Sequence, residues 1–300
     1  MTKDIQIKKS FTKTITGILF LIPTLIFVAF SLFIPTIWNF ILSFQEWDGF
    51  NDKKWVLFSN YIKAFQDDVL LKCLYNSVFL AVVTTLSSVV LGVILAGLIF
   101  RLGRVEGSIY RLIIFMPVMI PLAIIGLLFT FIYNPEMGLL NQFLVLIGLK
   151  GLTAAWLENQ ATIMWCIAIV GIWRITGLTM MLSFAGMQMI PVSLFESCKL
   201  DGAGYFRQFF SIMLPLVKPI IQLSTVFTLA ISFKTYDLVF VMTKGGPAGF
   251  SKTIPLHMID TSFGYNEFGY SSAMGFILTV IVMAIILLVN KFLGGEQYEF

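Results

Sequence analysis

The stretch CLYNSVFLAVVTTLSSVVLGVILAGLIF, residues 73–100, contains no charged side chain from its first residue to its last. It is longer than the roughly 20 residues that an α-helix needs to cross the hydrocarbon core of a bilayer. Three more uncharged runs of sufficient length lie at residues 14–45, 112–135 and 268–290. The sequence therefore predicts at least four membrane-spanning helices.

The composition of the whole chain agrees with this prediction. Its 300 residues are 58% hydrophobic and only 12% charged, with a mean hydropathy of +0.91, which lies far outside the usage of soluble globular proteins. Two further spans are predicted at 161–187, interrupted by Arg174, and at 219–242, interrupted by Lys234 and Asp237. The predicted fold class is an all-α polytopic membrane protein with about six transmembrane helices.

Other membrane architectures are disfavoured. A membrane barrel would show segments of about ten residues with alternating polarity, and no such alternation is present. The apolar run near the N-terminus is too long for the core of a signal peptide, so we interpret it as a retained first helix. The six helices are predicted at residues 17–38, 74–100, 112–133, 161–187, 219–242 and 272–290.

Two of these helices contain residues that indicate how they pack. The second helix carries small and hydroxyl residues that favour close helix contact, although they are also compatible with lining a pathway: Thr84, Thr85, Ser87, Ser88, Gly92 and Gly97. The third contains Pro117 and Pro121, which predict a kink or a local unwinding because proline cannot donate a backbone hydrogen bond.

The distribution of basic residues predicts the orientation. With the N-terminus inside, the inner segments hold eleven Lys and Arg residues and the outer segments seven, and four of the five arginines lie inside. Both termini, residues 1–16 and 294–300, are predicted to be cytoplasmic, with the transmembrane domain at 17–293 and the longest cytoplasmic loop at 188–218. The net charge of +4 follows from this bias and gives no reason to expect nucleic-acid binding.

The sequence gives little support for an enzymatic function of this chain. The chain lacks a phosphate-binding loop of the Gly-x-x-x-x-Gly-Lys-Ser/Thr type, and no catalytic residue can be assigned. Three widely spaced cysteines do not predict a metal site. The single histidine, His257, is expected to be an ordinary surface residue of an outer segment.

The loop at 188–218 has the local features of a helix-turn-helix elbow. Ser193 and Glu196 have the spacing of a capping box, which predicts a short helix at about 194–200. Gly202 suits the left-handed conformation that ends a helix, and a second helix is expected at about 204–213.

The same loop carries a recognisable motif. Glu196, Gly202, Ile212 and Leu214-Pro215 are in register with the EAA loop of ABC importer permeases, while Ser197 and Cys198 replace its two alanines. Further matching pieces are Met116-Pro117, Asn134-Pro135, Trp173 with Gly177, Ala185 to Pro191, Lys234 to Asp237, Thr243 to Pro247 and Phe268 to Ala273. The chain resembles the permease subunits of binding-protein-dependent ABC importers, in the carbohydrate-uptake family related to the maltose-system permeases.

The resemblance implies a function and a set of partners. The chain would be the permease subunit of a sugar importer in a bacterial or archaeal cytoplasmic membrane, working by alternating access. It would pair with a second homologous permease, two cytoplasmic ATP-binding subunits and an extracellular solute-binding protein. The partner ATPase would use ATP and magnesium, and this chain would bind no cofactor. The residues implied to contact the ATPase are Glu196, Ser197, Cys198, Asp201, Gly202 and Ala203.

The intramembrane charges allow two interpretations. Arg174, Lys234 and Asp237 would each cost on the order of 2.5–3.5 kcal/mol at a helix centre in contact with lipid, so we expect them to face protein or water. Lys234 and Asp237 are expected on one face of a continuous helix. These residues either form an internal charge pair or, with Trp173 and Tyr236, line the sugar pathway.

Two alternatives remain open at this point. The solute could be a compound other than a sugar, such as a glycerol phosphate ester or a polyol. The chain could also be an ion-coupled secondary transporter using Asp237 and Lys234 as a proton relay, which would leave the elbow unexplained.

Overall fold

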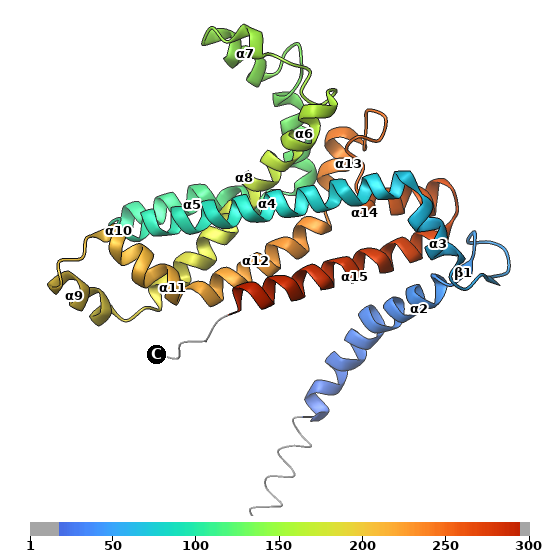
Figure 1. The fold of residues 1–300 in the computed structure, drawn as a ribbon, viewed down its shortest axis with the longest axis horizontal. Coiled ribbons are helices and arrows are strands. Elements are labelled where there is room, and N and C mark those ends of the chain that lie inside the picture. The colour runs from blue at the N-terminus through green and yellow to red at the C-terminus, as the bar shows by residue number, and fades with distance from the viewer. Residues whose placement is uncertain (1–17, 295–300) are drawn as a thin grey trace, which may run out of the picture. The chain divides into compact units, whose positions relative to one another are not determined.

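The computed structural model describes residues 18–294, so the predicted cytoplasmic segment 1–16 and nearly all of the predicted tail 294–300 lie outside the described residues. The chain divides into two compact units (Figure 1). Unit 1 comprises the chain up to Ala64 together with Thr261–Phe276, and unit 2 comprises Phe65–Asp260 together with the chain from Ile277 onward.

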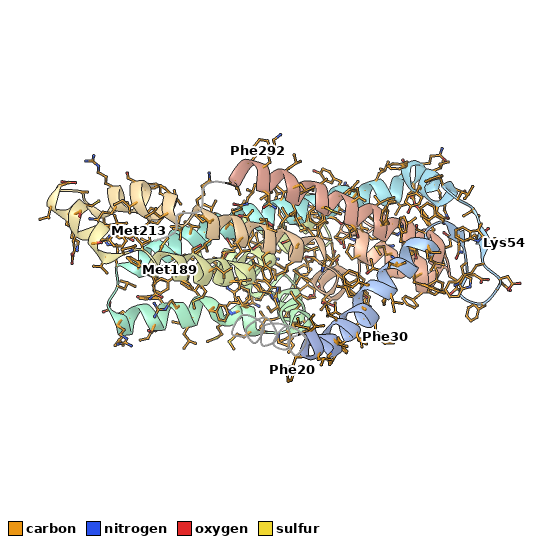
Figure 2. The ribbon with its side chains drawn as sticks, turned by 90° about the horizontal axis from the view of Figure 1, so that it is seen from below. Phe20, Phe30, Lys54, Met189, Met213 and Phe292 are labelled. Carbon is orange, nitrogen blue, oxygen red and sulfur yellow. The ribbon has the colours of Figure 1, made fainter. Side chains whose placement is uncertain are left out.

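Unit 1 contains the first predicted span. A helix at Ile18–Leu42, which includes the π-helical turn η1 (Ala29–Phe33) and α2 (Ile34–Leu42), leads into a two-stranded antiparallel hairpin of β1 (Gln45–Glu46) and β2 (Lys54–Trp55). The Asn60 side-chain amide, on α3 (Ser59–Gln66), donates to the carbonyl oxygens of Ser43 and Gln45 and fixes this corner. Phe20 and Phe30 of the first helix are exposed (Figure 2), as expected for a lipid-facing span.

Unit 2 is organised around two long helices, α4 (Asp68–Phe100) and α8 (Gln160–Gln188), which run in the same direction. Thr84 of α4 lies against Gly171 of α8. Further along both helices, towards their C-terminal ends, Gly92 of α4 lies against Thr179 of α8. The Thr179 hydroxyl donates to the Ser88 carbonyl oxygen at 2.6 Å. The predicted packing role is therefore confirmed for Ser88 and Gly92, and Thr84 both packs on α8 and lines a cavity. For Thr85 and Ser87 it stays a prediction.

The third predicted span is broken at its prolines. It consists of α5 (Arg104–Met119) and α6 (Leu122–Ile132), which meet at an angle of 96°. Ile120 is extended, because the ring of the following proline disfavours the helical conformation. The predicted interruption is confirmed, and the helix begins earlier than position 112.

The fifth predicted span is also broken, and the prediction of one continuous helix at 219–242 is wrong. α12 (Lys218–Phe233) ends before α13 (Asp237–Thr243), with Lys234 as the C-terminal cap of the first and Asp237 as the first residue of the second. Lys234 and Asp237 thus do not share a helical face. The Thr235 carbonyl oxygen, freed at the break, accepts a hydrogen bond from the Thr253 hydroxyl.

The remaining elements complete the two units. They are α7 (Leu139–Leu146), η2 (Lys150–Leu152), α9 (Val192–Leu200), α10 (Tyr205–Gln208), η3 (Phe209–Met213), α11 (Leu214–Leu216), α14 (Ile254–Ile259), η4 (Asp260–Gly264) and α15 (Phe268–Leu293). Within residues 18–294, four helices are long and apolar enough to cross a membrane, or up to six spans if each bent pair counts as one. This agrees with the predicted all-α class and with about six spans.

The contact between α4 and α8 leads to a test by substitution. A Cβ atom at Gly92 would clash with the Thr179 hydroxyl and lie 2.7 Å from the backbone nitrogen of Met180. We expect Gly92→Val to force the helices apart, cost about 1–3 kcal/mol and lower the thermal unfolding temperature of the purified chain. Gly103→Ala is the matched control, because nothing lies within 4 Å of a Cβ there. An unchanged unfolding temperature for Gly92→Val would contradict the described packing.

Candidate functional site

The elbow, defined here as residues 192–216, lies beyond the ends of α4 and α8 within unit 2 (Figure 1). None of the residues of α9 is buried. The predicted capping box is wrong: α9 begins at Val192 after Pro191, and its N-terminal cap makes no side-chain hydrogen bond. Ser193 lies inside the helix, where its carbonyl oxygen accepts from the Ser197 hydroxyl. Pro191 supplies a preset φ for entry, so the box is not needed.

The end of α9 was predicted correctly. Gly202 has a φ of +73°, the left-handed region that a residue with a Cβ rarely adopts. The Gly202 N–H donates to the Lys199 carbonyl oxygen and the Ala203 N–H donates to that of Cys198, which together make a Schellman motif. The turn between the two helices of the elbow is thereby fixed by backbone hydrogen bonds.

The second half of the elbow is attached to the end of α4. The Tyr205 hydroxyl donates to the Gly97 carbonyl oxygen, and the Arg101 guanidinium lies 4.6 Å from the centre of the Tyr205 ring. The buried Phe209 ring packs against Gly97, where a Cβ would collide with it. Met189 and Met213 lie near each other in Figure 2, and Met213 is fully buried whereas Met189 is exposed. The second half of the elbow is therefore anchored directly on α4.

The outward surface of the elbow mixes apolar and charged side chains. Val192, Leu200 and Phe206 have exposed fractions of 68%, 89% and 68%. Of the residues predicted to contact an ATPase, most are exposed and two are partly buried: Glu196, Ser197, Asp201 and Gly202 are exposed, and Cys198 and Ala203 are partly buried. The first three lie in the second half of α9 and the other three in the turn that follows it.

A cavity of about 310 Å³ lies within unit 2 between α4, α8, α12 and the break before α13. Arg174 and Lys234 both line it, together with the hydroxyl residues Thr84, Ser232 and Thr235. The remaining walls are apolar. Two of the predicted pathway residues therefore share a cavity, although they come from different elements.

The other three predicted pathway residues lie elsewhere. Trp173 faces a separate apolar cavity and packs on Phe129 with ring centres 5.5 Å apart. The Tyr236 ring stacks on Phe240 at 5.3 Å, and Asp237 is exposed at the start of α13. Asp237 is near enough for its charge to act on Arg174, but within the described part of the chain no ion pair joins them.

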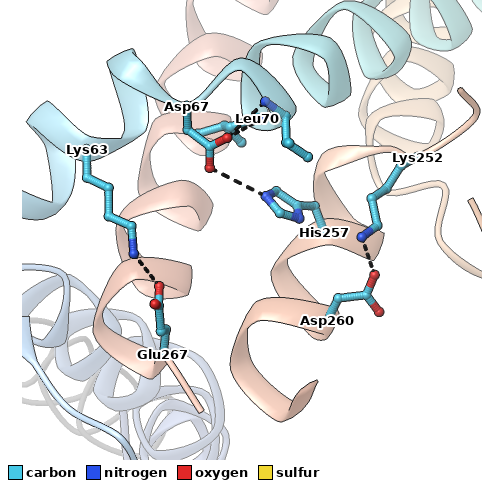
Figure 3. A network of polar contacts seen from close by, with 8 residues as sticks. Lys63, Asp67, Leu70, Lys252, His257, Asp260 and Glu267 are labelled. Atoms are coloured by element: carbon cyan, nitrogen blue, oxygen red, sulfur yellow. Dashed lines mark hydrogen bonds and ion pairs between the residues drawn. The ribbon is translucent and has the colours of Figure 1, made fainter. Parts of the chain in front are cut away.

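His257 is buried, so the expectation of a surface histidine is wrong. Its side chain points toward Asp67, with Nε2 and Oδ2 3.8 Å apart, and Lys252 pairs with Asp260 close by at 2.6 Å (Figure 3). Asp67 also accepts from the N–H groups of Val69 and Leu70 and so caps α4. In unit 1, Lys63 pairs with Glu267 at 2.5 Å. The burial of His257 arises because α14 packs on the start of α4, a long-range contact with no local pattern.

Comparison with models of known protein families shows to which family the chain belongs. Residues 88–294 match the model of the binding-protein-dependent transport system inner membrane component. The chain belongs to this family. It is a permease, a multi-pass membrane subunit whose family role is transport rather than catalysis, and the predicted resemblance is confirmed.

Similar proteins cover nearly the whole permease. The probable ABC transporter permease protein YurN of Bacillus subtilis is 37% identical over 94% of this chain and 97% of its own length. The diacetylchitobiose uptake system permease protein NgcF of Streptomyces coelicolor is 34% identical over 93% of this chain and 82% of its own. The trehalose/maltose transport system permease protein MalF of Thermococcus litoralis is 28% identical over 95% of both chains.

A solved structure shares the fold of the permease. A chain of a bacterial ABC transporter involved in the import of the acidic polysaccharide alginate superposes with a TM-score of 0.82, at 20% identity, covering 96% of this chain and 98% of that one. At this identity the similarity supports the fold alone.

Several contact residues of the permease were not found from its sequence. Tyr205 joins the elbow to Gly97, which was already predicted as a packing residue of α4, while Ser232 and Thr235 line the cavity with Arg174. Each contact joins parts of the chain that are distant in sequence or lies beside a helix break. Two prolines, Pro117 and Pro121, predicted the break in the third span. The break at 234–236 contains no proline that could have predicted it in the same way.

The buried histidine gives the permease a testable pH dependence. Burial lowers the pKa of His257 below its usual 6.5, and the nearby Lys252 lowers it further, while Asp67 and Asp260 oppose the shift. The folded state therefore binds fewer protons at His257 than the unfolded state does. The contribution of neutral His257 to the free energy of unfolding is fully present above about pH 6.5 and is lost as the pH falls. We expect the unfolding temperature to fall between about pH 7.5 and about pH 5, and to fall less in His257→Gln.

The chain has no other histidine, which makes this comparison specific. Identical pH profiles for the native permease and His257→Gln would contradict the assignment.

Proposed function

We propose that the chain is the permease subunit of an ATP-driven importer, and that its elbow is the docking site for a cytoplasmic ATP-binding subunit. The observation that carries this proposal is the elbow itself. α9 buries none of its own residues, yet it is held in a defined position by the Schellman turn and by Pro191. A nine-residue helix has little stability of its own in water, so a partner surface accounts for its exposed apolar side chains.

The distribution of side chains on α9 favours a protein partner over the bilayer surface. A helix lying in a membrane interface separates an apolar face from a polar one. On α9, Val192, Glu196 and Lys199 lie on one face at helical spacing, and Leu200 follows Glu196 by one turn. A protein interface accommodates apolar and charged side chains next to each other, because such interfaces are on the whole about as polar as the rest of a protein surface.

The attachment to α4 supports a mechanism for coupling. Force applied to α9 passes through the Schellman turn to α10 and then, through Tyr205 and Phe209, to the end of α4. Closure of two ATP-binding subunits would thus shift the helices between states open to opposite sides of the membrane. ATP and magnesium belong to those subunits in this proposal.

The transported solute is proposed to be a sugar or oligosaccharide. This is supported by the similar permeases of the diacetylchitobiose uptake system and of the trehalose/maltose transport system. A solved relative in fold was obtained with an alginate pentasaccharide-bound periplasmic protein, which supports delivery by a solute-binding protein. Segments 45–72, 134–160 and 243–271 are proposed to receive it, with a second permease completing the pathway. The location is a bacterial or archaeal cytoplasmic membrane, with both termini in the cytoplasm.

The docking proposal predicts the effect of reversing one charge on the elbow. Glu196→Lys should weaken association with the ATP-binding subunit by about tenfold or more and reduce uptake, because Glu196 lies in the centre of the exposed face. Association is measured by co-purification and uptake in proteoliposomes with the binding protein. Leu200→Asp should act in the same way by removing the most exposed apolar side chain of α9.

Glu106→Lys is the matched control, since it reverses an exposed carboxylate in the first turn of α5, outside the elbow and outside the segments proposed to receive the binding protein. The docking assignment would have to be abandoned if both elbow variants associated with the ATPase and supported uptake as well as the control.

The attachment of the elbow predicts a different effect for Tyr205→Phe. Removing the hydroxyl breaks the hydrogen bond to Gly97 without changing the exposed face of α9. We expect normal ATPase co-purification, with uptake per ATP hydrolysed reduced about two- to tenfold, since a hydrogen bond of this kind contributes about 0.5–1.5 kcal/mol. Full coupling in Tyr205→Phe would contradict transmission through this contact.

A further inference from the structure

The cavity beside the helix break has an unusual set of polar groups. Its volume of about 310 Å³ is at the lower end of the range of roughly 300–1,000 Å³ typical of small-molecule sites. Among the described residues that line it, the ionisable side chains are both cations, Arg174 and Lys234. Apolar side chains from α4, α6, α8 and α12 form the rest of the wall.

Two polar atoms of this cavity are buried without a hydrogen-bond partner in the described part of the chain. They are the Nε of Arg174 and the hydroxyl oxygen of Ser232. Ser232 has an exposed fraction of only 4%, so water outside the protein does not satisfy it. Because buried polar groups are almost always paired, these two atoms are available to hydrogen-bond a molecule held in the cavity.

The charges around the cavity indicate the charge of such a molecule. Asp237 is the carboxylate whose charge acts on Arg174, but it does not line the cavity. The cavity is thus lined by two cations and, among the described residues that line it, by no carboxylate. A cavity of this kind between membrane-spanning helices favours binding of an anion.

We propose that this cavity binds the carboxylate of an acidic saccharide between Arg174 and Lys234. The planar guanidinium suits a carboxylate because it presents parallel N–H donors. Ser232 and Thr84 supply hydroxyl groups for the hydroxyls of the sugar, and the apolar walls contact its ring faces. The proposal rests on the proposed function in that the saccharide is the transported solute.

Binding to the full chain in lipid nanodiscs tests this proposal. The probes are digalacturonate, its carboxyl-reduced neutral counterpart and inorganic phosphate, each titrated by calorimetry. We expect digalacturonate to bind about tenfold or more tightly than the neutral disaccharide, because the charged contacts are lost in the latter. Phosphate is expected to bind more weakly than digalacturonate, since it cannot use the apolar walls.

Variants of both cations locate the site. Arg174→Gln and Lys234→Gln should each reduce digalacturonate affinity about tenfold and leave the neutral disaccharide unaffected, while Arg174→Lys should retain part of the preference. Lys234 is exposed, so its variant is expected to fold even if Arg174→Gln does not. Lys218→Gln is the matched control, because Lys218 is an exposed cation at the other end of the same helix.

Three results would overturn the proposal: no binding of digalacturonate, equal affinity for the acidic and neutral disaccharides, or phosphate binding as tight as digalacturonate, which would indicate an inorganic anion site only. An affinity unchanged by both cation variants would overturn it as well. These titrations need no ATP-binding subunit. Failure here is therefore distinct from failure of the elbow variants, which tests the importer function.

Discussion

The close approach of α4 and α8 at Gly92 and Thr179 is the constraint on which the rest of unit 2 depends. The absence of a side chain at Gly92 allows the two backbones to meet, and the hydroxyl of Thr179 then bonds to the α4 backbone at Ser88. In a bilayer, where apolar association between helices has little driving force, such packing and hydrogen bonding hold helices together. Gly177 plays the same role for α5, since its missing Cβ leaves room for the backbone of Phe115.

Around this rigid pair, two spans are interrupted, and the interruptions provide the polar groups. The break at 234–236 frees backbone groups and places Lys234 and Thr235 at the cavity that Arg174 enters from α8. Irregular backbone at membrane depth persists only where protein or water satisfies it. Here the Thr253 hydroxyl satisfies the Thr235 carbonyl oxygen. The regular helices thus form the framework, and the break at 234–236 supplies polar groups that line the cavity.

The parts of this structure that were predictable from sequence are those with local causes. Apolar length predicted the spans, Pro117 and Pro121 predicted one break, and Gly202 predicted the end of α9. The capping box failed because Pro191 already begins the helix, and the continuous helix at 219–242 failed because Thr253, distant in sequence, stabilises the break. The same holds for His257, whose burial depends on the start of α4. Contacts between distant segments leave no periodic pattern to detect.

One geometric property of α4 has a mechanical consequence. This helix of 33 residues is unbroken, so it extends about 50 Å from the Asp67 and His257 contact at one end to the elbow attachment at the other. If a straight helix of that length tilted by about 5°, one end would be displaced relative to the other by about 4 Å. Such a tilt would connect the elbow with the segment at 250–254, which Asn76 and Ser77 bind towards the far end. The length of the uninterrupted helix, rather than its chemistry, sets the size of this displacement.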